Sequence, residues 1–286
     1  AYIAEVSPAA IRGRLGSLQQ LAIVTGIFAA LLSDALLANI AGAADQPLWG
    51  LTAWRWMFMV AAIPALVYGL VSLRLPESPR YLVRKGDMTR AAEVLETVTG
   101  AVDVDAKIKE ITSTIDTERK ESLRDLRGSR LGLKPIVWVG ILLSVFQQFV
   151  GINVIFYYST TLWQSVGFDE SSALLTSVIT SVTNIVVTII AILLVDKVGR
   201  RIMLLVGSVG MTVTLGLMAL AFSFGTLDAE GAATLPDPWA TVALICANGF
   251  VVFFGATWGP LVWVLLGEIF PNSIRAGALA VAAAAQ

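Results

Sequence analysis

The stretch SSALLTSVITSVTNIVVTIIAILLVDKVGRR, residues Ser171 to Arg201, decides the fold class of this chain. Its first part, up to Val195, contains no charged side chain, and about 20 such residues let a helix cross the hydrocarbon core of a bilayer. The apolar run is followed by Lys197, Arg200 and Arg201, and basic residues mark the cytoplasmic end of a span. The stretch therefore predicts a membrane-spanning helix with a basic cytoplasmic end.

Similar apolar runs recur along the whole chain. Of the 286 residues, 56% are apolar and 14% are charged, with a mean hydropathy of +0.77, whereas soluble domains carry about 25% charged residues. We predict an all-α, polytopic membrane helix bundle. Its spans are Leu15–Ile40, Trp56–Leu75, Pro135–Val166, Ser171–Val195, Ile202–Leu227 and Trp239–Phe270, flanked by a helix end at Ala1–Val6 and a helix start at Gly277–Gln286.

The positive charges alternate between successive loops and set the orientation. The loops 41–53, 167–170 and 228–238 contain no Lys or Arg, and of the 20 basic residues only Arg55 falls on their side of the membrane. By the positive-inside rule, the basic loops are cytoplasmic. We therefore expect a multi-pass protein of the cell membrane, monomeric and embedded in the lipid bilayer, with the charged segment 76–134 in the cytoplasm.

Composition also excludes several classes of site. The chain has no His and a single Cys, Cys246, so disulfide frameworks and metal sites built on His or Cys are ruled out. It shows no nucleophile–base set and no phosphate-binding loop. We expect no enzyme, no cofactor, no metal and no nucleic-acid partner.

The segment 76–134 differs from the rest because it is rich in both charges and has no apolar run of spanning length. Its stretch GDMTRAAEVLETVTG predicts a short helix with Asp87 as N-cap, an apolar face that includes Ala91 and Val94, and Gly100 as stop. We predict three parts, listed as 1–75, the end of an N-terminal bundle; 76–134, a cytoplasmic helical linker; and 135–286, most of a C-terminal bundle.

An internal repeat relates the two bundles. AEVSPAAIRG (4–13) and GEIFPNSIRA (267–276) share Glu, Pro, Ile and Arg at a constant offset, each where one helix ends in the cytoplasm and another starts. Such repeats are typical of transporter halves. Because one copy opens the chain and the other nearly closes it, we expect a fragment that lacks spans at both ends.

Polar side chains within the apolar runs mark the candidate site. Gln147, Gln148 and Asn153 must face protein, water or ligand, since an unpaired amide in an apolar environment costs about 1–3 kcal/mol. On one regular helix Asn153 would point away from the glutamines. We predict a helix break at Gly151 that brings them together.

Other spans carry similar groups. Ser177, Ser181, Asn184 and Thr188 form one polar stripe, in which we interpret the hydroxyls as links between helices and Asn184 as lining a cavity. Gln20 is the functional candidate of the first span. In the last full span we predict a break at Gly259–Pro260, with Trp258 as packing and Trp263 as a platform for a ligand. Amides, hydroxyls and indole without a mid-span Lys or Arg favour an uncharged, hydroxyl-rich solute.

These motifs resemble the sugar porter family of the major facilitator superfamily. The likeness rests on AEVSPAAIRGRLGSLQQLAIVTG, PESPRYL, QQFVGINVIFYYS, DKVGRR and WGPLVWVLLGEIFPNSIR, in this order. It implies a chain that runs from the end of helix 4 into helix 11 of twelve. By resemblance, the sugar-binding residues are Gln20, Gln147, Gln148, Asn153, Asn184, Gly259, Trp263 and Gln286.

The resemblance also implies gates. Tyr157 and Tyr158 would belong to the outer gate. A cytoplasmic latch would pair the charged residues Glu5, Arg12, Glu77, Arg80, Arg200, Arg201, Glu268 and Arg275 when that side is shut, although such charges also set topology. A network of ion pairs that is present in one state can bias a conformational equilibrium.

The resulting hypothesis is a transporter for a neutral sugar, a hexose or a pentose, that works by alternating access. The residues leave open whether it is a facilitator or a proton symporter. Two alternatives remain, a porter for another solute such as a polyol, inositol or an aromatic compound, and a non-transporting nutrient sensor with the same fold.

Overall fold

A computed structural model of the chain describes residues 12–99, 103–117, 126–128, 132–227, 233–271 and 274–286. The chain divides into two compact units. The larger unit consists of Gln19–Tyr68 and Phe146–Leu261, and the smaller unit of Gly69–Val145, Val262–Gln286 and the chain up to Leu18. Each unit is described separately below.

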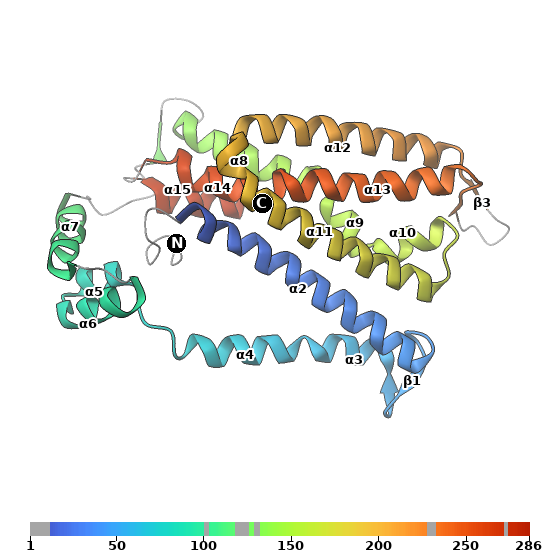
Figure 1. Cartoon of the computed structure of the whole chain (residues 1–286), viewed down its shortest axis with the longest axis horizontal. Helices are drawn as coiled ribbons and strands as arrows, with labels where there is room; N and C mark the ends of the chain where they lie inside the picture. Colours follow the sequence, from blue (N-terminus) through green and yellow to red (C-terminus); the bar gives the residue numbers. More distant parts are fainter. Residues whose placement is uncertain (1–11, 100–102, 118–125, 129–131, 228–232, 272–273) are drawn as a thin grey trace. The chain divides into compact units, whose positions relative to one another are not determined.

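The described residues are almost entirely helical (Figure 1). The helices are α2 (Arg12–Ala41), α3 (Ala53–Val60), α4 (Ala62–Ser72), α5 (Pro79–Lys85), α6 (Met88–Val94), a π-helical turn (Leu95–Thr99), α7 (Val104–Thr117), α8 (Pro135–Phe149), α9 (Ile152–Tyr157), α10 (Ser159–Ser165), α11 (Glu170–Val198), α12 (Arg200–Ser223), α13 (Trp239–Ala256), α14 (Trp258–Ile269) and α15 (Arg275–Ala284). Two antiparallel hairpins pair β1 (Pro47–Leu48) with β2 (Leu51–Thr52) and β3 (Thr226–Leu227) with β4 (Ala233–Thr234).

Among the described residues, six helical runs are long and apolar enough to cross a membrane. They confirm the predicted spans within a few residues, except that the third run ends at Tyr157 and not at Val166. They are Leu18–Ala41, Ala53–Ser72, Pro135–Tyr157, Glu170–Val195, Arg200–Ser223 and Trp239–Ile269. The all-α class is therefore confirmed, and α15 matches the helix start expected near Gly277. The expected helix end at Ala1–Val6 lies outside the described residues.

Three of these runs are interrupted. The third breaks at Gly151, as predicted, and again at Tyr158, which was not predicted. The last breaks at Thr257 (φ −136°, ψ −85°), so the predicted position at Gly259–Pro260 is two residues too late. Pro260 has no N–H for the carbonyl of Ala256, four residues earlier, and a proline therefore interrupts a helix upstream of itself. Pro64 likewise has no N–H for the carbonyl of Val60, four residues earlier, and α3 ends at Val60.

The larger unit is built around α13. Phe250, Val251 and Phe254 of this helix are buried in one apolar cluster with Trp163 of α10 and Ile155 of α9. Figure 1 shows α12 running alongside α13, and a glycine makes this contact close. A Cβ atom on Gly210 of α12 would collide with the ring of Phe253.

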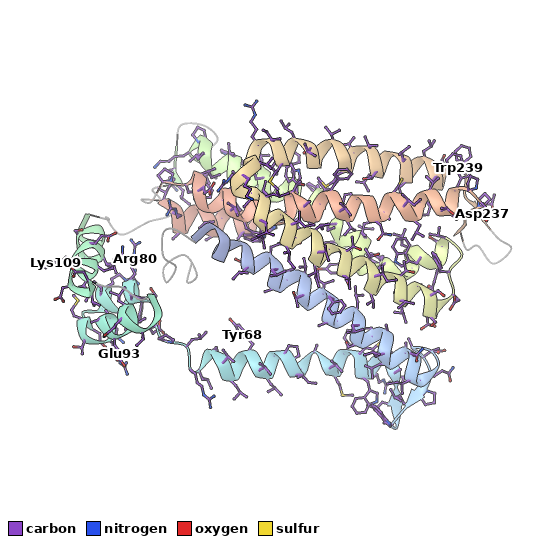
Figure 2. The ribbon with its side chains drawn as sticks, viewed as in Figure 1. Tyr68, Arg80, Glu93, Lys109, Asp237 and Trp239 are labelled. Carbon is purple, nitrogen blue, oxygen red and sulfur yellow. The ribbon has the colours of Figure 1, made fainter. Side chains whose placement is uncertain are left out.

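In the smaller unit, the short helices α5 to α7 form their own apolar cluster. Leu82, Val83, Ala91 and Val94 are buried there, with Ile108 and Ile111 of α7 packed against them. The carboxylate of Asp87 accepts from the backbone N–H of Arg90 at 3.2 Å, which confirms the predicted N-cap. The predicted stop at Gly100 lies outside the described residues. Charged residues such as Arg80, Glu93 and Lys109 come from the same three helices (Figure 2).

We predict that Gly210→Ala destabilises the larger unit by about 1–3 kcal/mol, because the added methyl group must displace the Phe253 ring from a packed position. The matched control is Gly216→Ala on the same helix, where a Cβ atom has no neighbour within 4 Å. Thermal denaturation of the purified protein in detergent measures the difference. Equal melting temperatures for the two variants would show that the glycine is not required for the contact between α12 and α13.

Candidate functional site

The break at Gly151 brings two of the predicted amides into contact. Gly151 has φ +90° and ψ +14°, and this left-handed conformation ends α8 and redirects the chain into α9. As a result, the amide nitrogen of Asn153 donates to Oε1 of Gln148 at 2.6 Å. The predicted helix break is confirmed, and it joins Gln148 and Asn153. Gln147, which was expected in the same group, bonds elsewhere. The side chain of Asn153 is exposed and that of Gln148 is half-buried.

Gln147 points to the interruption in the last span. Its side chain is 4% exposed, and its amide nitrogen donates to the carbonyl of Trp258 at 3.1 Å and to that of Gly259 at 3.2 Å. A buried amide requires such partners, and each carbonyl oxygen has two lone pairs to offer. Gln147 thus connects α8 with the first turn of α14.

Asn184 approaches the same segment from α11. It is 3% exposed, and a Cβ atom on Gly255 would lie 2.5 Å from its Oδ1. Within the described part of the chain, Oδ1 of Asn184 and the hydroxyl of Thr188, one turn later, are buried without a hydrogen-bond partner. Burying such a group unpaired costs about 1–3 kcal/mol. These two atoms can therefore accept a hydrogen bond from a ligand or water.

Gln20 completes the convergence from α2. It is buried, and its amide nitrogen lies 3.3 Å from the position that a Cβ atom of Gly259 would take. Gln20, Gln147 and Asn184 therefore come from three different helices and all reach the segment 255–259. We call this segment the break segment.

Two hydroxyls of the polar stripe bond within their own helix, which differs from the prediction. Ser177 donates to the carbonyl of Ala173 and Ser181 to that of Val178, both within α11, so their interpretation as links between helices is wrong. A serine hydroxyl easily reaches the carbonyl one turn back in its own helix. The link is made instead by Thr180, whose hydroxyl donates to Oδ1 of Asn248 on α13 at 3.0 Å.

The remaining predicted residues lie as follows. Tyr157 and Tyr158 are 75% and 63% exposed; Tyr157 ends α9, and Tyr158 is the residue at which the third span breaks a second time. Trp263 and Gln286 belong to the smaller unit and are half-buried. Their roles stay predictions.

The residues of the predicted latch divide into three groups. Glu5 lies outside the described residues, as does the side chain of Arg12, whereas Glu77, Arg201 and Glu268 are exposed and Arg80 is half-buried. The guanidinium groups of Arg200 and Arg275 donate to the carbonyls of Val195 and Phe270 at 3.3 Å and 3.2 Å. Their pairing in a latch stays a prediction.

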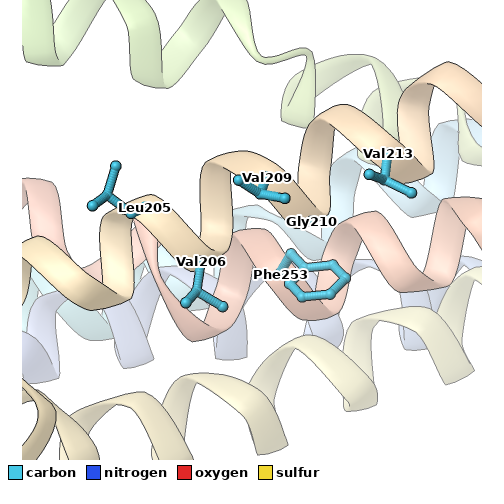
Figure 3. Close-up of a pocket in the computed structure, with 6 residues that line it drawn as sticks. All are labelled: Leu205, Val206, Val209, Gly210, Val213 and Phe253. Carbon is cyan, nitrogen blue, oxygen red and sulfur yellow. The ribbon is translucent and has the colours of Figure 1, made fainter.

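An apolar groove lies elsewhere, on the exposed face of α12 (Figure 3). It is lined by Leu205, Val206, Val209, Gly210, Val213 and Phe253. None of these side chains can donate or accept a hydrogen bond, so the groove suits an acyl chain and not a sugar. The described residues also contain no group of His, Cys, Asp and Glu side chains that could hold a metal ion.

Comparison with known proteins identifies the family. The family model described as "Sugar (and other) transporter" matches residues 1–286. The chain belongs to this transporter family. Membership in a transporter family agrees with the prediction that the chain is not an enzyme. Together with the six membrane-length helices among the described residues, it identifies a multi-pass protein of the cell membrane.

Proteins similar to the chain carry the names of sugar porters. The "Glucose transport protein" of Synechocystis sp. is 55% identical over the whole chain, and the "D-xylose-proton symporter" of Escherichia coli K12 is 40% identical. The chain spans 61% and 54% of their lengths. The structure of the major facilitator proton:xylose symporter XylE bound to 6-bromo-6-deoxy-D-glucose matches with a TM-score of 0.78 and 36% identity, over 100% of this chain and 56% of that one.

Two contacts at the break segment of this family member were not predicted. The side chain of Thr257 lies where a Cβ atom of Gly207 would be, and the indole N–H of Trp258 donates to the hydroxyl of Ser208 at 2.9 Å. Trp258 was interpreted as packing only. In the sequence, only Pro260 indicated where these contacts would form, because its missing N–H places the interruption near Ala256.

We predict that Gly151→Ala destabilises the protein by about 1–2 kcal/mol, since a side chain in the left-handed region costs about that much. Gly151→Asn should cost less, because asparagine tolerates this conformation better. Gly26→Ala within α2 is the control, since a Cβ atom there meets nothing within 4 Å. Melting temperatures in detergent test the order, and an Ala variant at Gly151 as stable as the control would contradict it.

Proposed function

We propose that the full-length protein carries a neutral sugar, a hexose or a pentose, across the cell membrane by alternating access. The observation that supports this most is the convergence of three uncharged, buried amides, from Gln20, Gln147 and Asn184, on the break segment. The names of the similar proteins, a glucose transport protein and a D-xylose-proton symporter, support the same class of substrate.

The chemistry of these groups fits a polyhydroxylated solute. An amide both donates and accepts, as a sugar hydroxyl does, so each can pair with vicinal hydroxyls without a net charge. Oδ1 of Asn184 is buried without a partner among the described residues, so a hydrogen bond from a sugar hydroxyl would offset the cost of burying it. Gln148 and Asn153 offer a second polar pair. Trp263 would supply an apolar surface for the ring, and Gly259 and Gln286 would complete the site.

The transport cycle would follow from the predicted architecture. The two bundles, 1–75 and 135–286, would rock about the sugar while the segment 76–134 stays in the cytoplasm as the link. Tyr157 and Tyr158 would close the outer side. The latch residues Glu5, Arg12, Glu77, Arg80, Arg200, Arg201, Glu268 and Arg275 would hold the cytoplasmic side shut, with the protein acting as a monomer in the bilayer.

The relative named as a proton symporter supports proton coupling over simple facilitation. A polyol or inositol porter is the second candidate, because the same amides would recognise any vicinal diol. Uptake of labelled D-glucose and D-xylose into proteoliposomes, in competition with inositol and polyols, separates these substrates. Accumulation above equilibrium under an inward proton gradient indicates a symporter, whereas equilibration alone indicates a facilitator.

We predict that Gln148→Ala in the full-length protein weakens sugar binding about tenfold. A net hydrogen bond is worth about 0.5–1.5 kcal/mol, and about 1.4 kcal/mol corresponds to a factor of ten. Gln46→Ala is the control, since this glutamine lies exposed in the loop before β1 and should leave binding unchanged. Equilibrium binding of labelled sugar measures both. Unchanged affinity and uptake in Gln148→Ala would remove this residue from the site.

A further inference from the structure

The side chain of Trp258 is attached to α12 by a directed hydrogen bond. Its indole N–H donates to the hydroxyl of Ser208 at 2.9 Å and lies 3.3 Å from the carbonyl of Leu204. The hydroxyl of Ser208 itself donates to that carbonyl at 2.8 Å. The serine therefore accepts from one side and donates to the other, and it fixes the indole on the surface of α12 at one position.

The neighbouring residues make a second contact between the same two segments. A Cβ atom on Gly207 would collide with the side chain of Thr257, the residue at which the last span is interrupted. The hydroxyl of Thr257 donates to the carbonyl of Phe253 at 2.6 Å and satisfies the end of α13. Gly207 and Ser208 of α12 thus lie directly against Thr257 and Trp258.

The backbone of the same tryptophan is held from another side. The carbonyl of Trp258 accepts from the amide of Gln147, a residue predicted to bind the sugar. Trp258 is therefore held from two sides, by its ring against Ser208 and Leu204 of α12 and by its carbonyl, which accepts from Gln147. A displacement of the ring from Ser208 would shift the carbonyl that orients the amide of Gln147.

We propose that Ser208 is a positioning residue for the sugar site. Its hydroxyl bonds to Leu204 and Trp258, neither of which is in the predicted sugar-binding set, and α12 contributes no residue to that set. Instead Ser208 fixes the ring of Trp258, which fixes the first turn of α14 and thereby the amide of Gln147. This inference rests on the proposed transport of a sugar for its functional consequence, whereas the attachment of the break segment to α12 is independent of that proposal.

The test compares Ser208→Ala, Trp258→Phe and the double variant in the full-length protein, with labelled D-glucose as the probe. Both single variants remove the bond between the indole and Ser208, and Trp258→Phe also removes the contact of the indole with the carbonyl of Leu204. Bonds between membrane helices typically correspond to a factor of about three, with a maximum of about fifteen. We expect each single variant to raise the dissociation constant by about three- to fifteenfold, and the double variant to bind no more weakly than the weaker single one. Ser208→Thr, which keeps the hydroxyl, should restore affinity.

Ser223→Ala is the matched control, because this exposed hydroxyl at the other end of α12 donates to the carbonyl of Leu220 within its own helix. Its dissociation constant should equal that of the wild type. A purely structural role for Ser208 would lower the melting temperature and the number of binding sites while the dissociation constant stays unchanged. That outcome, or additive effects in the double variant, would overturn the proposal.

Hydrogen–deuterium exchange separates this inference from the proposed function, since it needs no sugar. In the wild type, the backbone amide of Thr257 bonds to the carbonyl of Phe254, and that of Leu261 bonds to the carbonyl of Thr257. In Ser208→Ala, both amides should exchange faster. The control Ser223→Ala should leave them unchanged. If the wild type binds no sugar, the proposed function fails, and exchange still decides whether Ser208 fixes the break segment. Unchanged exchange in Ser208→Ala would overturn that attachment.

Discussion

A backbone group in the hydrocarbon core needs a partner within the protein, because the lipid offers none. Pro260 withdraws one N–H from the last span, and Thr257 leaves the helical conformation. The protein supplies side chains at this place. The hydroxyl of Thr257 donates to the carbonyl of Phe253, and the amide of Gln147 donates to two carbonyls of the next turn. A hydroxyl and an amide therefore bond to backbone carbonyls on the two sides of the interruption, where the polar side chains of the larger unit gather.

Side chains can approach this interruption because glycines surround it. A Cβ atom on Gly207 would displace the side chain of Thr257, and one on Gly255 would displace that of Asn184. A Cβ atom on Gly259 would come close to the side chain of Gln20. Close approach through small residues is the usual means of packing membrane helices, where no hydrophobic force drives association. Here the same glycines also admit polar groups, so packing and the assembly of a polar site depend on the same positions.

Much of this organisation could be predicted from the sequence, and the limits have physical reasons. The six spans follow from hydropathy, and the Gly151 break follows from amides that one regular helix could not gather. Ser177 and Ser181 were misinterpreted, since their sequence spacing does not reveal whether a hydroxyl bonds within its own helix or to another. The bond between Trp258 and Ser208 joins residues 50 positions apart, and only the packing of α12 against α13 creates it. Local pattern predicts local structure, whereas such contacts require the fold.

The amides that the sequence grouped together differ in what they can still do. The amide nitrogen of Gln147 already donates to two carbonyls, so it stabilises the interruption before it can serve any ligand. Asn184 and Thr188 are as deeply buried, yet each keeps an oxygen without a partner among the described residues. Leaving these atoms unpaired lowers stability, and a hydroxyl that reached them would recover the loss without introducing charge. The amide nitrogen of Gln147 is therefore already used in holding the interruption, whereas Asn184 keeps unused acceptor capacity for the proposed sugar.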